Sequence, residues 1–91
     1  MNRTIEHNPD FHRFEYTEDA IQSLLDYQLE GGVMSIVHTD VPQALAGRGI
    51  AADLTRTALD TARQEGWRVH PVCSYADAYI RRHSEYQDLL A

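Results

Sequence analysis

Residues 38–52 read HTDVPQALAGRGIAA, and this stretch decides the fold of the chain. The β-rich run VMSIVH at residues 33–38 leads into it, and a long amphipathic pattern leaves it. This order predicts a strand, a glycine-containing loop and a helix in immediate succession. Gly47 and Gly49 allow the backbone to turn its amide groups toward an anion, and the unpaired N–H groups at the start of the helix favour negative charge.

The loop is therefore a candidate phosphate site, and Arg48 adds a mobile positive charge beside it. A plain tight turn is the alternative, because many glycine pairs serve only that purpose. The chain contains no G-x-x-x-x-G-K-S/T motif, and its glycines do not form G-x-G-x-x-G. The sequence thus indicates neither a P-loop nor a dinucleotide-binding fold.

The clearest element is the helix predicted over residues 49–65, which Gly66 ends. On a helical wheel its apolar and charged residues separate into two arcs. Ala51 and Ala52 in the first turn would let a ligand approach the backbone closely, although alanine is also simply a good helix former. The apolar arc contains Ile50, Ala51, Ala52, Leu54, Ala58, Leu59 and Ala62.

Alternation of polar and apolar residues predicts the strands around this helix. Residues 21–30 also fit a helical spacing, but the pair Gly31–Gly32 and the β-rich run after it favour a hairpin. In the strand that follows, alternation places Met34, Ile36 and His38 on one face. The predicted strands cover residues 11–16, 21–30, 33–39 and 67–72, with a turn at 17–20.

The strand at 67–72 should run parallel to the one at 33–39, because a helix connects them. Pro71 lacks a ladder donor, so pairing should fail near the end of this strand. Ser74 is predicted to cap a further helix, with Asp77 at its third position. The remaining segments are a loose arm or short edge strand at residues 1–10, and a terminal helix at 85–90 that packs Tyr86, Leu89 and Leu90 onto the domain.

The composition narrows the class of protein. With 91 residues and a net charge of −6, the chain forms one small domain and lacks the basic surface that nucleic-acid binding needs. No apolar run approaches the roughly 20 residues that span a bilayer, and residues 1–10 contain no hydrophobic signal core. We therefore expect a cytoplasmic protein with no membrane partner. One cysteine makes no internal disulfide, and the five scattered histidines predict no metal site.

Four motifs follow one another in fixed order between residues 38 and 86, namely HTDVP, GRGIA, P-x-C-S-Y-A and Y-I-R-R-H-x-E-Y, and the resemblance they carry covers roughly residues 10–90. Together they resemble the small single-domain members of the GNAT superfamily, which are acetyl-CoA-dependent N-acetyltransferases. The pyrophosphate loop of that family has the pattern Q/R-x-x-G-x-G/A. Residues 46–51 read AGRGIA, which match both small positions but carry Ala46 where the family has Gln or Arg.

The resemblance implies an α/β (α+β) fold, with a mixed, mostly antiparallel sheet, a central splayed pair of parallel strands, and two to three helices. Residues 1–91 would form a single minimal acetyltransferase domain that uses acetyl-CoA. The pantetheine arm of the cofactor would lie between strands that end at Thr39 and Val72. The implied cofactor-binding residues are Val41, Gly47, Arg48, Gly49, Ile50, Ala51 and Ala52.

Three residues are candidates for the chemistry. Cys73 stands between a strand end and a helix start, where the helix N-terminus lowers a thiol pKa, but it is equally compatible with a small buried hydrophobe. His38, at the same edge of the sheet, could act as a base for Cys73 or for an incoming amine, or be only a surface residue. By resemblance Tyr79 could protonate the leaving CoA thiolate, or it could be a core aromatic. Direct transfer to the amine and an acetyl-cysteine intermediate at Cys73 both stay open.

The predicted function is the transfer of an acetyl group from acetyl-CoA to an amine. The acceptor is a small amine or a protein amine, such as a lysine side chain or an N-terminus. It docks on an open surface or in a site that a second copy completes in a homodimer. Two alternatives belong to other classes: a non-catalytic module that binds CoA or acetyl-CoA, and a protein-interaction domain in which the glycine loop is merely a turn.

Overall fold

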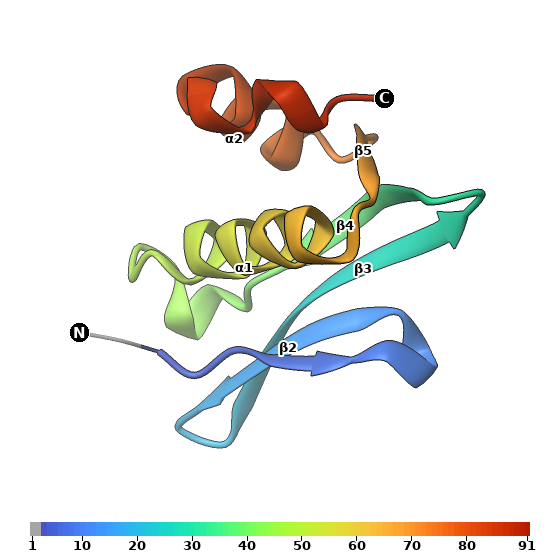
Figure 1. Ribbon diagram of the computed structural model, residues 1–91. Helices are drawn as coiled ribbons and strands as arrows, with labels where there is room; N and C mark the ends of the chain where they lie inside the picture. Colours follow the sequence, from blue (N-terminus) through green and yellow to red (C-terminus); the bar gives the residue numbers. More distant parts are fainter. Residues whose placement is uncertain (1–2) are drawn as a thin grey trace.

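The structure is a computed structural model that describes residues 3–91 (Figure 1). The chain forms a single sheet, two α-helices and short 3₁₀ segments, and the last strand of the sheet lies between the two helices in the sequence. The strands are β1 (Glu6–Asn8), β2 (Arg13–Glu18), β3 (Ile21–Glu30), β4 (Val33–Asp40) and β5 (Arg68–Pro71). The helices are α1 (Ile50–Glu65) and α2 (Ser74–Arg82), and the 3₁₀ segments are η1 (Pro9–Phe11), η2 (Gln43–Leu45) and η3 (Ser84–Leu89).

The strands lie in the sheet in the order β1-β2-β3-β4-β5. Neighbours are antiparallel except β4 and β5, which are parallel and joined by the crossover helix α1. The predicted mixed, mostly antiparallel fold is confirmed, and residues 21–30 are a strand rather than a helix. The parallel pair lies at one edge of the sheet and not at its centre as predicted. Within residues 72–91, the only further pairing next to β5 is an isolated bridge between Leu90 and Val69.

The two hairpins close through very short turns. The pair Gly31–Gly32 connects β3 to β4 with φ values of 58° and 77°, a left-handed backbone that glycine adopts without strain. The pair Asp19–Ala20 alone connects β2 to β3, because Glu18 already pairs with Ile21. The four-residue turn predicted at 17–20 is therefore wrong.

The N-terminal segment forms the edge strand β1, which is one of the two predicted alternatives. Phe11 does not begin the next strand as predicted. Pro9 starts η1 instead, the side chain of Phe11 is 72% exposed, and β2 begins at Arg13. The fixed φ of proline suits the first position of a helical turn, which explains the difference.

A β-bulge interrupts the pairing between β3 and β4. Asp26 and Tyr27 are consecutive on β3, but their partners on β4, His38 and Ile36, are separated by Val37. One extra residue on a strand inverts the alternation of side chains beyond it. The bulge therefore decides the orientation of the last residues of β4.

Beyond the bulge, Thr39 pairs with Leu25, which is buried against the core, so Thr39 faces the helices. His38 pairs with Asp26 and is exposed on the opposite face of the sheet. The prediction that His38 shares a face with Met34 and Ile36 is therefore wrong. Simple alternation fails here because it cannot anticipate a bulge.

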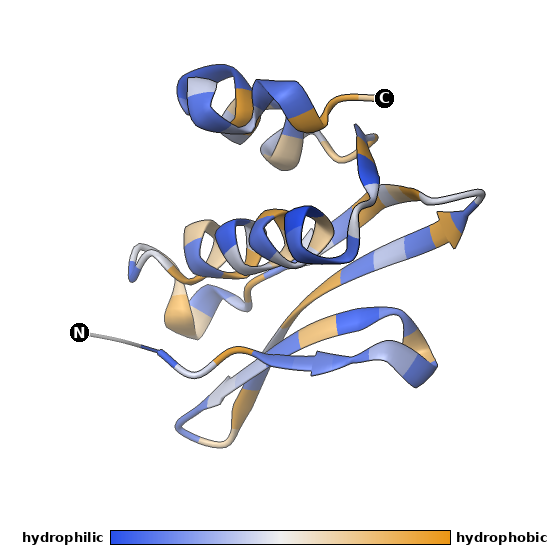
Figure 2. Cartoon of the chain, viewed as in Figure 1, coloured by the Kyte–Doolittle hydropathy of each residue, from blue (hydrophilic) through white to orange (hydrophobic). Residues whose placement is uncertain are grey.

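Helix α1 packs its apolar face against the sheet and closes the core (Figure 1). Figure 2 shows hydrophobic and hydrophilic residues interleaved along α1, as expected for a helix with one buried face. The N-cap is Gly49 and the C-cap is Gly66, so the helix keeps close to its predicted bounds. The buried core of the chain contains Phe14, Leu25, Tyr27, Met34, Ile36, Leu45, Ile50, Leu54, Ala58, Leu59, Ala62, Val69, Ala76, Tyr79, Ile80, Tyr86 and Leu89.

Helix α2 begins one residue earlier than its predicted cap implies. Cys73, not Ser74, is the N-cap, and its carbonyl accepts the N–H of Asp77 at 3.0 Å. The predicted Ser74 cap is wrong because Ser74 already has helical geometry. The carboxylate of Asp77 contacts Arg81 at 3.1 Å instead of closing a capping box.

The C-terminal segment returns to the sheet as the short helix η3, which has 3₁₀ geometry and spans Ser84–Leu89 where the sequence predicted residues 85–90. It buries Tyr86 and Leu89, whereas Leu90 is 40% exposed and forms a parallel bridge with Val69. Across residues 3–91, no helix has both the length and the apolar character needed to traverse a bilayer.

Candidate functional site

Strand β5 separates from β4 halfway along it. Their ladder ends where Ile36 pairs with Pro71. The next N–H after β5, that of Val72, bonds to the carbonyl of His70 at 3.1 Å and so forms a three-residue turn centred on Pro71. The N–H of Cys73 instead bonds to the carbonyl of Ile36 at 2.8 Å. The predicted failure of pairing at this point is therefore confirmed, and in the described chain no strand pairs with β4 beyond Ile36 on this side.

The physical reason for the separation differs from the predicted one. The carbonyl of Val69 accepts the N–H of Ala91 at 2.9 Å, so the backbone of Val69 faces away from β4. Because this direction alternates along a strand, the backbone of Pro71 faces away from β4 too. The missing N–H of Pro71 is thus not the lost ladder donor. Its fixed φ instead suits the centre of the turn that withdraws Val72.

The loop between η2 and α1 exposes backbone amides at the start of the helix. Gly47 and Gly49 both have φ of 81°, which residues with side chains rarely adopt. No side chain caps α1, and its first internal bond runs from the N–H of Asp53 to the carbonyl of Gly49 at 3.1 Å. The N–H groups of residues 50–52 therefore lack a helical partner, and they carry the positive end of the helix dipole.

This loop borders a mostly apolar pocket of about 330 Å³. The pocket brings together every predicted cofactor-binding residue except Arg48. It also includes three residues that the sequence did not single out for this role: Leu45 of η2, Ala46 directly after it, and Tyr75 of α2. The lining residues are Val41, Leu45, Ala46, Gly47, Gly49, Ile50, Ala51, Ala52 and Tyr75.

The side chain of Arg48 points away from this pocket into an ion pair. Its guanidinium pairs with Glu18 and lies 3.4 Å from Asp19, both at the β2–β3 turn. The hydrogen bond that Arg48 donates to Glu18 is the main cause that raises the pKa of Arg48. The expectation of a mobile charge is therefore wrong, because two carboxylates that are distant in sequence hold the side chain.

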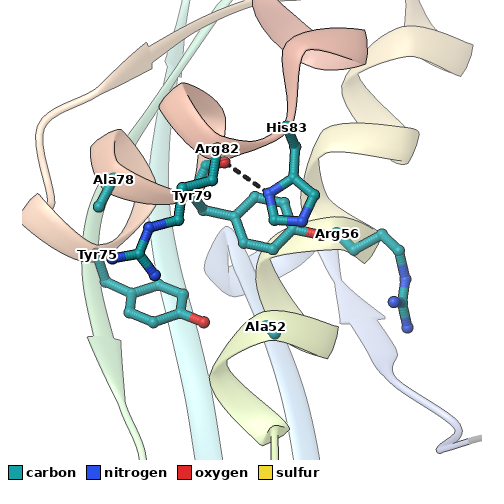
Figure 3. A pocket seen from close by; sticks show the side chains of 7 residues that line it. All are labelled: Ala52, Arg56, Tyr75, Ala78, Tyr79, Arg82 and His83. Atoms are coloured by element: carbon teal, nitrogen blue, oxygen red, sulfur yellow. Dashed lines mark hydrogen bonds between the residues drawn. The ribbon is translucent and has the colours of Figure 1, made fainter.

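A second pocket of about 360 Å³ continues from the first, since Ala52 and Tyr75 line both. It lies between α1 and α2, and Figure 3 shows its side chains. The ring of His83 stacks on Tyr79 at 3.9 Å between centroids, and its Nδ1 hydrogen-bonds the carbonyl of Tyr79 at 2.8 Å. The lining residues are Ala52, Arg56, Tyr75, Ala78, Tyr79, Arg82 and His83.

We call the two joined pockets the α1 groove. Its two ends differ in chemistry, because the first pocket offers backbone amides and apolar side chains while the second offers the guanidinium groups of Arg56 and Arg82. Helical periodicity places these two arginines on the same helix faces as Ala52 and Tyr75, but it does not indicate that α1 and α2 pack together. Arg56 lies one turn after Ala52, and Arg82 lies two turns after Tyr75.

Cys73 lies where β5 turns into α2, and its Sγ is 3.6 Å from Oγ1 of Thr39 on β4. Burial raises the pKa of the thiol, but interactions with the amide of Ala76, the hydroxyl of Thr39 and the amide of Tyr75 outweigh it. The net pKa lies below the usual value, in the direction that the sequence predicted. Cys73 therefore sits in a microenvironment that favours the thiolate.

The other two candidate residues do not join Cys73 in a cluster. His38 is on the opposite face of the sheet, whereas Thr39 occupies the place beside the thiol. Tyr79 is only 8% exposed and lies in the second pocket, and burial raises the pKa of its hydroxyl. Their catalytic roles stay predictions. In residues 3–91, no three His, Cys, Asp or Glu side chains gather as metal ligands would.

Comparison with known proteins supports one family. A model of GCN5-related N-acetyltransferases matches residues 13–89. Protein NATD1 of Gallus gallus is 36% identical over 61 residues, which is 66% of this chain and 56% of NATD1. Protein NATD1 of Homo sapiens is also 36% identical over 61 residues, 66% of this chain and 54% of its own length. The chain thus spans little more than half the length of these curated relatives.

A solved structure has the same fold. The solution NMR structure of a GCN5-like protein from Staphylococcus aureus superposes with a TM-score of 0.76 and covers 99% of this chain and 89% of its own. Its sequence identity is 23%, so the likeness concerns the fold. Because the family model matches most of the chain, the motif resemblance is confirmed, and the chain belongs to the GCN5-related N-acetyltransferase family.

Proposed function

We propose that this chain is an acetyl-CoA-dependent N-acyltransferase that acetylates an amine, and that one domain over residues 1–91 carries the activity. The observation that supports this function best is the α1 groove, which Val41, just after β4, and Tyr75, near the start of α2, help to line. The groove combines anion-binding amides with apolar walls and two cationic side chains. Coenzyme A carries groups complementary to these: a pyrophosphate, a pantetheine arm and a phosphorylated nucleoside.

The residues present fit the parts of the cofactor. The free amides of residues 50–52 suit the pyrophosphate, because helix N-termini bind anions. The apolar walls of the first pocket, with Val41 and Tyr75, suit the pantetheine arm. Arg56 and Arg82 of the second pocket suit the phosphorylated nucleoside. The combined volume matches that of ordinary small-molecule sites.

Two routes of acetyl transfer are compatible with the position of Cys73. In direct transfer, the amine nitrogen attacks the thioester carbonyl, the C–S bond breaks, and the CoA thiolate takes up the proton that the amine loses. In the covalent route, the Cys73 thiolate attacks the thioester carbonyl and CoA leaves as its thiolate. The amine then attacks acetyl-Cys73, the C–S bond to Cys73 breaks, and the amine proton passes to the released CoA thiolate while the Cys73 thiolate is regenerated. The lowered pKa of Cys73 favours the second route. His38 could serve as a base in the direct route only for an amine that approaches from the opposite face of the sheet.

The binding test replaces Ala52, which lines both pockets, by aspartate. A carboxylate in the first turn of α1 favours the helix, so the fold should be kept. It would repel phosphate groups, and we expect acetyl-CoA to bind at least about tenfold more weakly by calorimetry. Gln64→Glu adds the same charge at the exposed far end of α1 and should bind like the wild type. Equal affinity of the Ala52→Asp variant and the wild type would contradict this placement.

The turnover test separates the two routes and the non-catalytic alternative. Acetyl-CoA alone should leave an acetyl group on Cys73, detectable by mass spectrometry, if the covalent route operates. The variants Cys73→Ala and His38→Ala should then be compared for release of CoA thiol with a panel of small amines and lysine peptides. Loss of turnover in His38→Ala without an adduct on Cys73 would favour direct transfer. Saturable binding without turnover on any acceptor would favour a CoA-binding module.

A further inference from the structure

The N-terminal arm contacts the glycine loop from outside. Nη1 of Arg3 lies 2.5 Å from Oδ2 of Asp53 in the first turn of α1, and Nη2 of Arg3 donates to the carbonyl of Arg48. The guanidinium also lies over the ring of Tyr16, 5.8 Å from its centroid. Only 17% of the Arg3 side chain is exposed. Figure 1 shows the blue N-terminal segment on the same side of the molecule as the start of α1.

The loop has few other anchors. Gly47 and Gly49 have no side chains to pack, and a Cβ placed on Gly47 would meet nothing within 4 Å. Arg48, which stands between them, is held at both ends, by Arg3 at its carbonyl and by Glu18 at its guanidinium. The contact with Arg3 holds the peptide between Arg48 and Gly49, directly before α1.

Arg3 also changes the charge that an anion in the groove would meet. Asp53 directly follows Ala52, so its carboxylate stands beside the amides that would bind phosphate. Arg3 donates a hydrogen bond to Oδ2 of Asp53, and Arg56 donates one to Oδ1 at 2.6 Å. Two guanidinium groups thus neutralise the negative charge nearest to the free amides.

We infer that Arg3 is a positioning residue for the anion-binding loop, which it holds in shape through the Arg48 carbonyl while it offsets the charge of Asp53. This inference rests on the proposed function, because the anion is the pyrophosphate of acetyl-CoA. Arg3 acts through the loop and does not touch the ligand. The N-terminal arm is therefore part of the cofactor site although it lies outside the family motifs.

The test compares Arg3→Gln and Arg3→Lys with a matched control, Arg63→Gln. Arg63 lies near the far end of α1 and has the same three kinds of partner: the carboxylate of Asp88, the carbonyl of Glu85 and the ring of Tyr86. Two quantities are measured: amide hydrogen exchange of residues 47–53 in the ligand-free protein, and the dissociation constant of acetyl-CoA.

Arg3→Gln should accelerate exchange in residues 47–53 and weaken acetyl-CoA binding about tenfold, since it loses charge-assisted hydrogen bonds. Arg3→Lys should recover part of the affinity, because it keeps the charge but cannot contact both partners as a planar fork does. Arg63→Gln should change neither quantity. If turnover is measured, KM should rise while kcat stays unchanged.

Unchanged exchange in Arg3→Gln would overturn the inference whether or not the protein binds acetyl-CoA. Faster exchange with unchanged affinity would overturn it as well, because the contact would then be only structural. If the wild type binds no acetyl-CoA, the proposed function fails, whereas the exchange measurement still decides whether Arg3 holds the loop. Failure of the inference about Arg3 and failure of the proposed function are therefore distinguishable.

Discussion

At the scale of single residues, the thiol of Cys73 gives the most direct prediction. Contacts with the amides of α2 and with Thr39 lower its pKa despite burial. Its alkylation by iodoacetamide should therefore show a pH midpoint below the ordinary value of about 8.5. Thr39→Val removes the hydroxyl contact and should move the midpoint upward. The control is the urea-unfolded protein, and identical midpoints in the folded and unfolded protein would refute the prediction.

At the level of residues, the sequence predicts the surroundings of a side chain correctly where the order of residues along the chain determines them. Cys73 must precede α2, and the glycines must precede α1, so both neighbourhoods were correctly inferred. Prediction from the sequence failed where one residue of register decides the outcome. Because of the bulge at Val37, Thr39 and not His38 lies on the face of the sheet that carries the core. Cys73 and not Ser74 is the N-cap of α2. Neither event has a local sequence signal, because both depend on contacts with another strand or helix.

At the scale of elements, β1 is attached through a histidine. The ring of His7 stacks on Phe14 at 4.3 Å between centroids, and its Nε2 is 2.6 Å from the hydroxyl of Tyr27. Burial lowers the pKa of His7, Glu65 at the end of α1 raises it, and His12 lowers it, with a net shift downward. The edge strand is therefore packed around a neutral imidazole.

The sign of the pH effect follows from this shift. The unfolded chain protonates His7 near its ordinary pKa of about 6.5, before the folded chain does. Stability is thus full above this pH and falls as the pH drops through it toward the folded pKa. The urea midpoint should decrease between pH 7 and pH 5. The decrease should be smaller in His7→Phe, and His70→Gln on β5 is the control. An unchanged pH dependence in His7→Phe would contradict the prediction.

The sequence predicted the elements unevenly, for physical reasons. Helix α1 and the β3–β4 hairpin carry their own signals, an apolar arc and a diglycine turn, and both are present. The short segments β1 and η1 carry no such sequence signal, and their conformation depends on the pairing of β1 with β2. Phe11 illustrates this, because alternation placed it in a strand that the turn at Pro9 excludes.

At the scale of the whole molecule, ligand binding and stability are coupled. A ligand that binds only the folded chain stabilises it by about 2.7 kcal/mol at a hundredfold excess over its dissociation constant. In a domain of this size, that corresponds to a rise in melting temperature of about 10 to 20 °C. Thermal unfolding with acetyl-CoA should show this rise, and ATP should produce a smaller one. Equal shifts with both ligands would indicate general nucleotide binding.

The small size of the chain also explains what the sequence could not predict about the site. The Cα radius of gyration is 12.4 Å, so a cofactor lies on the surface, as the length of the chain suggests. The end of the α1 groove at the glycine loop is predictable from the sequence, because the residues that line it there follow one another in the chain. The end with Arg56 and Arg82 depends on how α1 and α2 pack together, and no single segment encodes that arrangement.

The turn at Pro71 has a consequence for the energetics of ligand entry. Because the N–H of Val72 is already satisfied by the carbonyl of His70, the separation of β5 from β4 breaks no hydrogen bond when a ligand arrives. No part of the binding free energy is spent on parting the strands. An extended amide chain meets the edge of β4 beyond Ile36, with which no strand of the described residues pairs on this side, so association should need no slow opening step.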